Sequence, residues 1–146
     1  MTHIKNNFLY LVFLTFIYSY QNANHWNSLT SALNSHSITE DSNGYIIGAT
    51  SGGLLKLSES IEILKDNLSD INTNVVGIDS KNNIWIGNNS FNSNIQVLDK
   101  DYNLIYNSIY SLQNLENILD FAFYSDKVFC IYKDLNGYGI LEFNYE

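Results

Sequence analysis

Short apolar runs separated by polar turns recur along this chain at a regular spacing. Residues 38–57 read ITEDSNGYIIGATSGGLLKL, and a related pattern, VGIDSKNNIWIGNNSFNSNIQVL, returns at residues 76–98. Each copy contains an Asp, a polar turn, an apolar run that ends near a Gly, a loop and a further apolar run. A looser third copy covers residues 118–143. Self-similarity with a period of about forty residues is typical of repeat architectures.

The alignment of the first two copies places Asp41 on Asp79 and Gly48 on Gly87, with one residue inserted in the second turn. The short runs and frequent turns predict antiparallel strands rather than helices. The predicted strands are 37–41, 45–49, 54–57 and 61–65 in the first copy, 75–79, 84–87, 94–98 and 104–109 in the second, and 118–124, 127–133 and 139–143 in the third.

Units of about forty residues with four strands each are the blades of a β-propeller. The sequence therefore predicts an all-β domain over residues 24–146, an incomplete propeller of about two and three-quarter four-stranded blades. The expected blades cover approximately residues 37–66, 75–110 and 118–146.

Residues 41–54 (DSNGYIIGATSGGL) and 79–87 (DSKNNIWIG) resemble the two-component regulator propeller repeat, D-x-x-G-x-[IL]-W-[IV]-[GA]-T-x-x-G-L. Residues 25–31 (HWNSLTS) are similar to the Trp-bearing segment that precedes the first blade in that family. The second copy departs from the pattern, because residues 88–93 replace its T-x-x-G-L loop. The resemblance implies an exported propeller, as in the periplasmic sensor regions of hybrid histidine kinases and in proteins associated with type IX secretion.

The amino-terminal residues predict export. Lys5 is followed by the uncharged apolar run FLYLVFLTFIYSY at residues 8–20. A membrane-spanning helix needs about twenty such residues, so this shorter run is typical of a bacterial secretory signal peptide, expected over residues 1–23. The expected location is the periplasm, the cell surface or the medium. The alternative is a membrane anchor formed by uncleaved residues 8–20.

Charge and composition argue against several function classes. The net charge is −8, and the seven basic residues are scattered, so we expect no nucleic-acid partner. The three histidines have no metal-ligand spacing, and no nucleophile or phosphate-binding motif occurs, so we expect neither a cofactor nor catalysis. Residues 99–110 begin like a calcium loop but lack its Gly and its final acid, which indicates a hairpin turn instead. Cys130 lies in an apolar run and is expected to be a buried small hydrophobe.

The recurring residues have structural explanations. An Asp before a turn can accept hydrogen bonds from the turn amides. Gly44 is expected to supply positive φ, and Gly48 and Gly87 to permit close backbone approach where adjacent blades taper. We expect Trp85 to pack between blades. The positions interpreted as structural are Asp41, Gly44, Gly48, Gly53, Asp79, Trp85 and Gly87. For ligand binding, the candidates are Tyr45, Trp85 and Phe91, as stacking platforms.

A propeller closes into a ring of about four to eight blades, more than the sequence supplies. We expect the chain to be the amino-terminal part of a longer protein, whose further blades complete the ring. Self-association of several copies is the alternative. The predicted function is a non-catalytic module that binds a protein or other ligand or senses a signal. The alternative is an oligomeric, lectin-like propeller that binds carbohydrate.

Overall fold

The computed structural model describes residues 34–64, 66–89, 95–108 and 115–144, and the structural statements below concern these residues. They form eleven β-strands and no α-helix. The described residues include no helix that is both long and apolar enough to cross a bilayer. The expected signal peptide, the Trp26 segment and Phe91 lie outside the described ranges.

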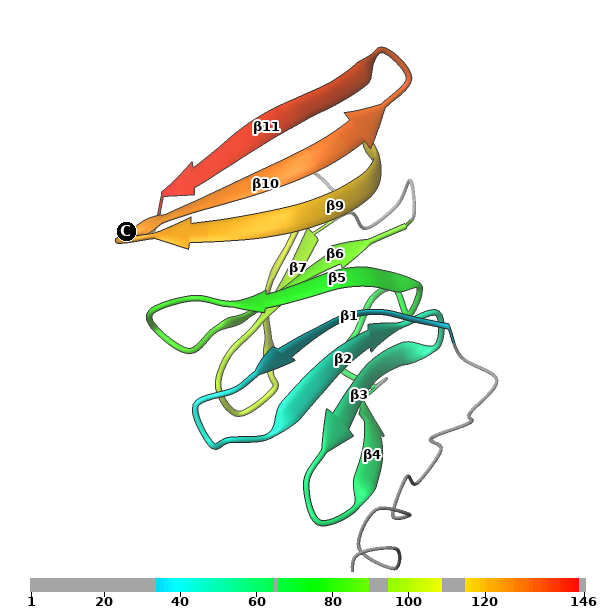
Figure 1. Ribbon diagram of the computed structural model, residues 1–146, viewed down its shortest axis with the longest axis vertical. Helices are drawn as coiled ribbons and strands as arrows, with labels where there is room; N and C mark the ends of the chain where they lie inside the picture. Colours follow the sequence, from blue (N-terminus) through cyan, green and yellow to red (C-terminus); the bar gives the residue numbers. More distant parts are fainter. Residues whose placement is uncertain (1–33, 65, 90–94, 109–114, 145–146) are drawn as a thin grey trace, which may run out of the picture. The chain divides into compact units, whose positions relative to one another are not determined.

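The strands form three antiparallel sheets, each assembled from strands in sequence order (Figure 1). Blade 1 contains β1 (Ser35–Glu40), β2 (Ile46–Thr50), β3 (Gly53–Leu57) and β4 (Ile61–Leu64). Blade 2 contains β5 (Thr73–Ile78), β6 (Ile84–Asn88), β7 (Ile95–Leu98) and β8 (Leu104–Asn107). Blade 3 contains β9 (Leu115–Tyr124), β10 (Lys127–Asp134) and β11 (Gly137–Asn144).

The predicted all-β class is confirmed, and so is the order of short strands. Blade 3 differs from the other two because its three described strands are longer, at 10, 8 and 8 residues, than any strand of blades 1 and 2. Each of the three sheets is a meander of the kind that forms a propeller blade. The described part of the chain is therefore a partial β-propeller.

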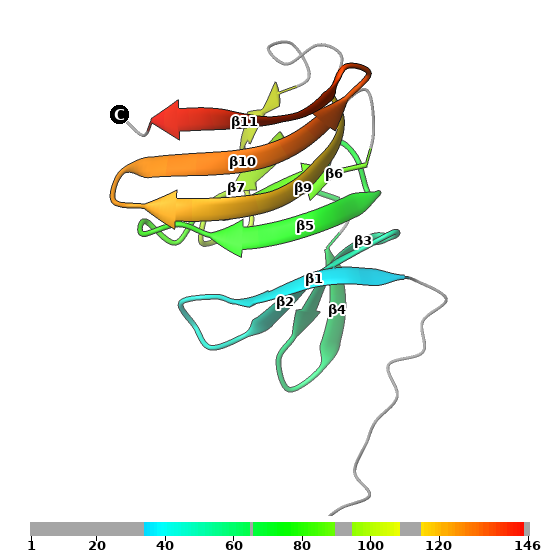
Figure 2. The same ribbon diagram turned by 45° about the horizontal axis from the view of Figure 1, so that its top comes forward.

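The first strands of the three blades, β1, β5 and β9, lie side by side (Figure 2). Polar side chains join them. Asn74 Nδ2 donates to the Ile118 carbonyl at 2.6 Å, and the Ser37 hydroxyl lies 3.4 Å from the Val76 carbonyl. The buried Thr73 hydroxyl donates to the carbonyl of Thr50 and accepts from its amide, both at 2.8 Å.

Each junction between blades encloses its own apolar core, because alternate residues of a strand face opposite sides of its sheet. The core between blades 1 and 2 consists of Ile47, Ala49, Leu54, Val76, Ile84, Ile86 and Leu98. The core between blades 2 and 3 consists of Val75, Trp85, Ile95, Val97, Leu115, Ile118, Val128 and Cys130. Blade 2 thus buries both of its faces, whereas blades 1 and 3 each bury one face against it.

Candidate functional site

Three hairpin turns share one geometry. In each, an Asp Oδ1 accepts the backbone amides two and four residues further on, at 2.8–2.9 Å. The residue three positions after the Asp has positive φ: 79° at Gly44, 64° at Asn82 and 65° at Tyr102. The turns begin at Asp41, Asp79 and Asp99, so the third is the hairpin predicted in place of a calcium loop.

This shared geometry corrects the alignment of the two repeats. Glu40 pairs with Ile46 in blade 1 and Ile78 pairs with Ile84 in blade 2, so the two turns have equal length. The predicted one-residue insertion is wrong. Without it, Gly87 corresponds to Ala49, and Trp85 corresponds to Ile47.

The close backbone approach expected at two glycines occurs at only one of them. A Cβ on Gly87 would lie 2.4 Å from Ile118 Cγ2, so blade 3 packs directly on this backbone. Gly77 on the neighbouring strand is similarly close to Phe123, at 2.5 Å. A Cβ on Gly48 would meet nothing closer than 3.7 Å, so the close approach expected for Gly48 is wrong. Gly53, with φ of 117°, begins β3 after the short β2–β3 turn.

Trp85 lies between blades 2 and 3, with almost its whole side chain buried. Its Nε1 donates to Asp79 Oδ2 at 2.8 Å. Its ring centroid is 5.5 Å from that of Phe143 and 6.1 Å from that of Phe121. Edge and tilted contacts of this kind are favourable between aromatic rings.

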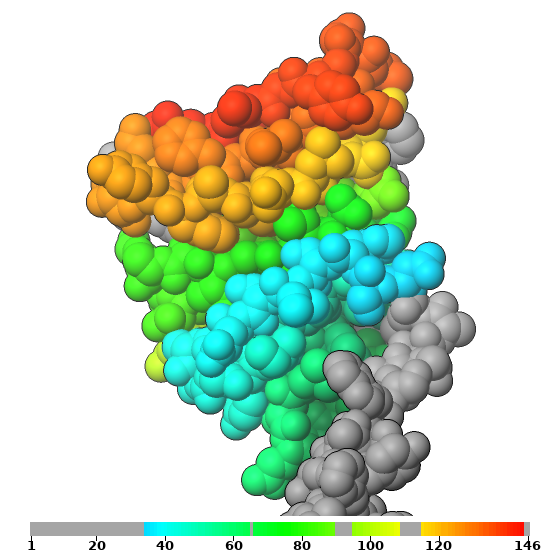
Figure 3. All heavy atoms as spheres, in the orientation of Figure 1, coloured from blue at the N-terminus to red at the C-terminus, as the bar shows by residue number. Residues whose placement is uncertain are grey.

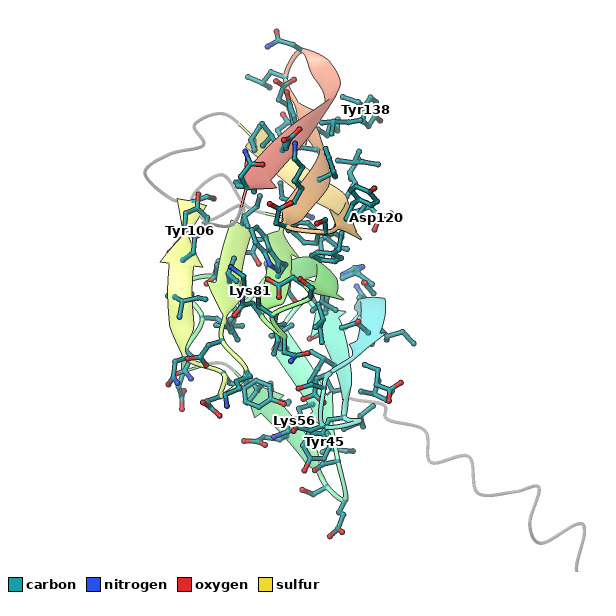
Figure 4. The ribbon with its side chains drawn as sticks, turned by 90° about the vertical axis from the view of Figure 1, so that its left-hand side faces the viewer. Tyr45, Lys56, Lys81, Tyr106, Asp120 and Tyr138 are labelled. Atoms are coloured by element: carbon teal, nitrogen blue, oxygen red, sulfur yellow. The ribbon has the colours of Figure 1, made fainter. Side chains whose placement is uncertain are left out.

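The corresponding junction between blades 1 and 2 is closed by a different set of side chains. The Tyr102 hydroxyl, from the β7–β8 turn, donates to Asp41 Oδ2 at 2.7 Å. Lys56 Nζ lies 4.7 Å from the ring centroid of Tyr45 and 4.5 Å from that of Tyr102, a double cation–π contact. Figure 4 shows Tyr45 and Lys56 adjacent in blade 1. The β7–β8 turn of blade 2 therefore contacts blade 1 through Tyr102.

The contact between Tyr102 and Asp41 shifts the pKa of both side chains. Burial and the hydrogen bond to Asp41 raise the pKa of Tyr102. Burial pushes the pKa of Asp41 upward, but the hydrogen bonds from Tyr102, Tyr45 and Asn43 outweigh burial and hold the pKa below 3.8. The pKa of Asp41 is lower in the folded than in the unfolded protein. Its carboxylate therefore stabilises the fold fully at pH values above the unfolded-state pKa, and this contribution is lost as the pH falls through the folded-state pKa.

Replacement of Tyr102 by Phe should lower the free energy of unfolding by about 1.5 kcal/mol at neutral pH, since a hydrogen bond to a carboxylate is lost. Denaturant unfolding at neutral pH and at a pH below the folded pKa of Asp41 measures both effects. The difference in the free energy of unfolding between wild type and variant should be smaller in acid, where Asp41 is protonated in both the folded and the unfolded state. An equal difference at both pH values would contradict this assignment.

The junction between blades 2 and 3 has a pocket at the position that Lys56 fills in the junction between blades 1 and 2. A pocket of about 300 Å³ is lined by Lys81, Asn83, Trp85, Val97, Ile105, Tyr106, Phe143 and Asn144. By register, Val97 occupies the place of Lys56, and Tyr106 occupies the place of Glu62. The shorter Val97 side chain leaves open the volume that Lys56 fills in blade 1.

The pocket combines aromatic walls with polar groups. Trp85, Tyr106 and Phe143 supply rings, and the Tyr106 and Phe143 centroids are 6.5 Å apart. Lys81 supplies a positive charge, while Asn83 and Asn144 supply amides; Figure 4 shows where Lys81 and Tyr106 lie in blade 2. Small-molecule sites commonly have this make-up, mostly apolar with a few polar groups that fix orientation.

The three residues predicted as stacking platforms do not form one site. Trp85 lines the pocket, Tyr45 lies at the preceding junction beneath Lys56, and Phe91 is outside the described residues. Sequence reasoning did not single out Tyr106, Phe143 or Lys81. A repeat alignment that places the additional residues of blade 2 in the β6–β7 loop would have shown Val97 opposite Lys56, and that difference was the available signal.

Two other candidate chemistries can be described. Cys130 is fully buried, and burial raises the pKa of its thiol to about 12, so it packs as a protonated thiol. Within the described ranges, no three His, Cys, Asp or Glu side chains cluster closely enough to hold a metal ion.

No family model matches this chain, and no curated protein matches it. Among solved structures, it is similar to a catalytically inactive virginiamycin B lyase from Staphylococcus aureus with quinupristin, at 11% identity and a TM-score of 0.52. That protein is a β-propeller. The match covers 82% of this chain and 44% of the lyase, so the chain spans less than half the length of this neighbour. At this identity, the likeness supports the propeller fold alone.

A second solved structure, a protein of unknown function from Bacteroides caccae, is also similar. It is 10% identical with a TM-score of 0.35, over 80% of this chain and 62% of that chain.

Proposed function

We propose that this chain is an exported, non-catalytic β-propeller module that binds a small ligand, either as a sensor or as a cell-surface binding protein. The observation that carries the proposal is the aromatic pocket between blades 2 and 3. Its polar lining residues are one lysine, two asparagines and one tyrosine, a set suited to hold a ligand. The proposal of export rests on the uncharged apolar run at residues 8–20 behind Lys5.

The pocket favours a planar or ring-shaped ligand that carries a hydroxyl or an anionic group. Aromatic rings can cover the apolar face of such a ligand, and amides can bond its polar edge. Lys81 adds the positive charge to the lining, in a chain whose net charge is −8. An anionic group would therefore orient toward Lys81.

Carbohydrate is the second candidate, and the combination of aromatic rings with two amides favours it. A sugar presents an apolar face to an aromatic ring and hydroxyls to amides. The two candidates differ at Lys81, because a neutral sugar gains little from a positive charge, whereas a carboxylate gains a charge-assisted hydrogen bond.

Fluorescence titration tests the proposal. In a Trp26→Phe chain, Trp85 is the one remaining tryptophan and reports on the pocket. We expect a saturable change of its emission with at least one compound from a panel of neutral glycans and small aromatic or sugar carboxylates. Tyr106→Ala should weaken that binding by about tenfold, equivalent to about 1.4 kcal/mol.

Tyr138→Ala is the matched control, since Tyr138 is an exposed aromatic in blade 3 and does not line the pocket. Lys81→Ala should weaken binding of carboxylates and leave neutral glycans unchanged. Absence of binding across both panels would contradict the proposal. So would binding that Tyr106→Ala and Tyr138→Ala reduce equally.

A further inference from the structure

The two junctions on either side of blade 2 are built from corresponding positions. Figure 3 shows the atoms of β5, in green, between those of β1, in cyan, and those of β9, in yellow. Three side chains of blade 1 gather at the first junction, and the residues at the same repeat positions in blade 2 all line the pocket at the second. The pairs, blade 1 first, are Tyr45 and Asn83, Lys56 and Val97, and Glu62 and Tyr106.

The junction between blades 1 and 2 holds an ammonium group at these positions. Lys56 Nζ lies 4.7 Å from the ring centroid of Tyr45 and 4.5 Å from that of Tyr102 (Figure 4). The Glu62 carboxylate is 3.8 Å from the same nitrogen, and the Lys56 side chain is only 17% exposed. A cation between aromatic faces is favourable, and more so where water is partly excluded. This junction therefore supplies its own cationic occupant.

The junction between blades 2 and 3 has the aromatic rings but supplies no such occupant. Trp85 and Tyr106 of blade 2 line the pocket together with Phe143, which comes from the opposite blade as Tyr102 does at the first junction. Val97 is too short to extend between these rings. The volume of about 300 Å³ is at the lower end of the range for small-molecule sites, so a ligand of amino-acid size is suited to it.

Asp79 determines which polar atoms the pocket presents. Its buried carboxylate accepts Asn83 Nδ2 at 2.9 Å and Trp85 Nε1 at 2.8 Å. A carboxylate can only accept hydrogen bonds, so the Asn83 amide turns its NH₂ group toward Asp79 and its Oδ1 acceptor to the opposite side. Aromatic faces, an amide oxygen and a nearby buried carboxylate together favour a positive charge. Lys81 lines the same pocket and favours a negative one.

We propose that the pocket binds an aromatic amino acid, with its ammonium group at the position that Lys56 Nζ occupies in the preceding junction. The rings and Asn83 Oδ1 stabilise the ammonium group, and Lys81 bonds the carboxylate. This inference rests on the proposed function, because it names the class of ligand for the same pocket. It distinguishes an amino acid from the α-hydroxy acid of the same side chain, in which a neutral hydroxyl replaces the ammonium group.

Titration calorimetry of the full chain with phenylalanine, tyrosine and histidine tests the inference, each beside its α-hydroxy acid. At least one amino acid should bind about tenfold more tightly than its hydroxy acid, the effect of one cation–π site. Equal or tighter binding of the hydroxy acids would overturn the inference and leave the pocket as a ligand site, as would binding of neutral glycans alone. No binding of any of these compounds would contradict the proposed function and this inference with it.

Val97→Lys tests the position of the ammonium group. Its own ammonium group would enter the pocket as that of Lys56 does at the first junction, so amino-acid binding should fall by about tenfold or more. Val97→Ala is the control, because it leaves the volume open and should keep the preference for the amino acid. Undiminished binding by a Val97→Lys chain with the wild-type circular dichroism spectrum would overturn the inference. If that variant did not fold, the comparison of amino acid with hydroxy acid on the unaltered chain would still decide.

Discussion

Replacement of Gly87 by Ala is expected to destabilise the protein by about 2 kcal/mol, the usual cost of overpacking a core. The new methyl group would lie 2.4 Å and 2.5 Å from two atoms of Ile118 and 2.6 Å from Val75 Cγ1. These neighbours are themselves buried at the junction between blades 2 and 3, so they have little room to move. Denaturant unfolding of the variant and the wild type measures the difference.

Gly48→Ala is the control for this prediction, since Gly48 also lies within a strand but has no neighbour closer than 3.7 Å to an added Cβ. It should be neutral, or stabilising by about 0.5 kcal/mol, because Ala loses less backbone freedom than Gly on folding. If the two substitutions had equal effects, the packing of blade 3 on the Gly87 backbone would be contradicted.

Asp79→Ala should cost about 3 kcal/mol, since the variant leaves buried donors without an acceptor. Asp79 is buried, and its carboxylate accepts the amides of Lys81 and Asn83, Asn83 Nδ2 and Trp85 Nε1, all at 2.8–2.9 Å. Its loss should also loosen the ring of Trp85, which near-ultraviolet circular dichroism would detect together with the lowered unfolding midpoint.

Asp99→Ala separates the effect of burial from that of the turn. Asp99 accepts the same pair of turn amides, but its carboxylate faces solvent, and its bonds to Asn103 hold its pKa below 3.8. Water can replace those bonds, so the variant should lose only a small part of what Asp79→Ala loses. Comparable losses would show that the buried contact with Trp85 contributes nothing.

The strand order could be predicted from the sequence because it depends on local patterns. Alternating apolar residues define strands, and turns such as Asp41 to Gly44 end them. The alignment of the two repeats was harder to predict. Matching Gly48 with Gly87 requires an inserted residue, but the strand register shows turns of equal length and places Gly87 opposite Ala49. Positive φ at Asn82, in the place of Gly44, shows that the turns match without any insertion.

The candidate site could be predicted only in part, because it depends on contacts between blades. Trp85 was identified as an inter-blade residue from its repeat position. The pocket beside it arises because Val97 stands where blade 1 has Lys56, and because Phe143 approaches from blade 3. Such contacts join residues far apart in the sequence, and a local pattern carries no information about them.

Blades 2 and 3 pack on one another through Trp85, which lies in their shared core and also lines the pocket. Nuclear Overhauser contacts from the Trp85 ring protons in the folded chain test this packing most directly. The structure predicts contacts to the rings of Phe143 and Phe121, with centroids at 5.5 and 6.1 Å, and slow exchange of the Nε1 proton bonded to Asp79. Absence of both ring contacts, with rapid exchange of that proton, would contradict the account.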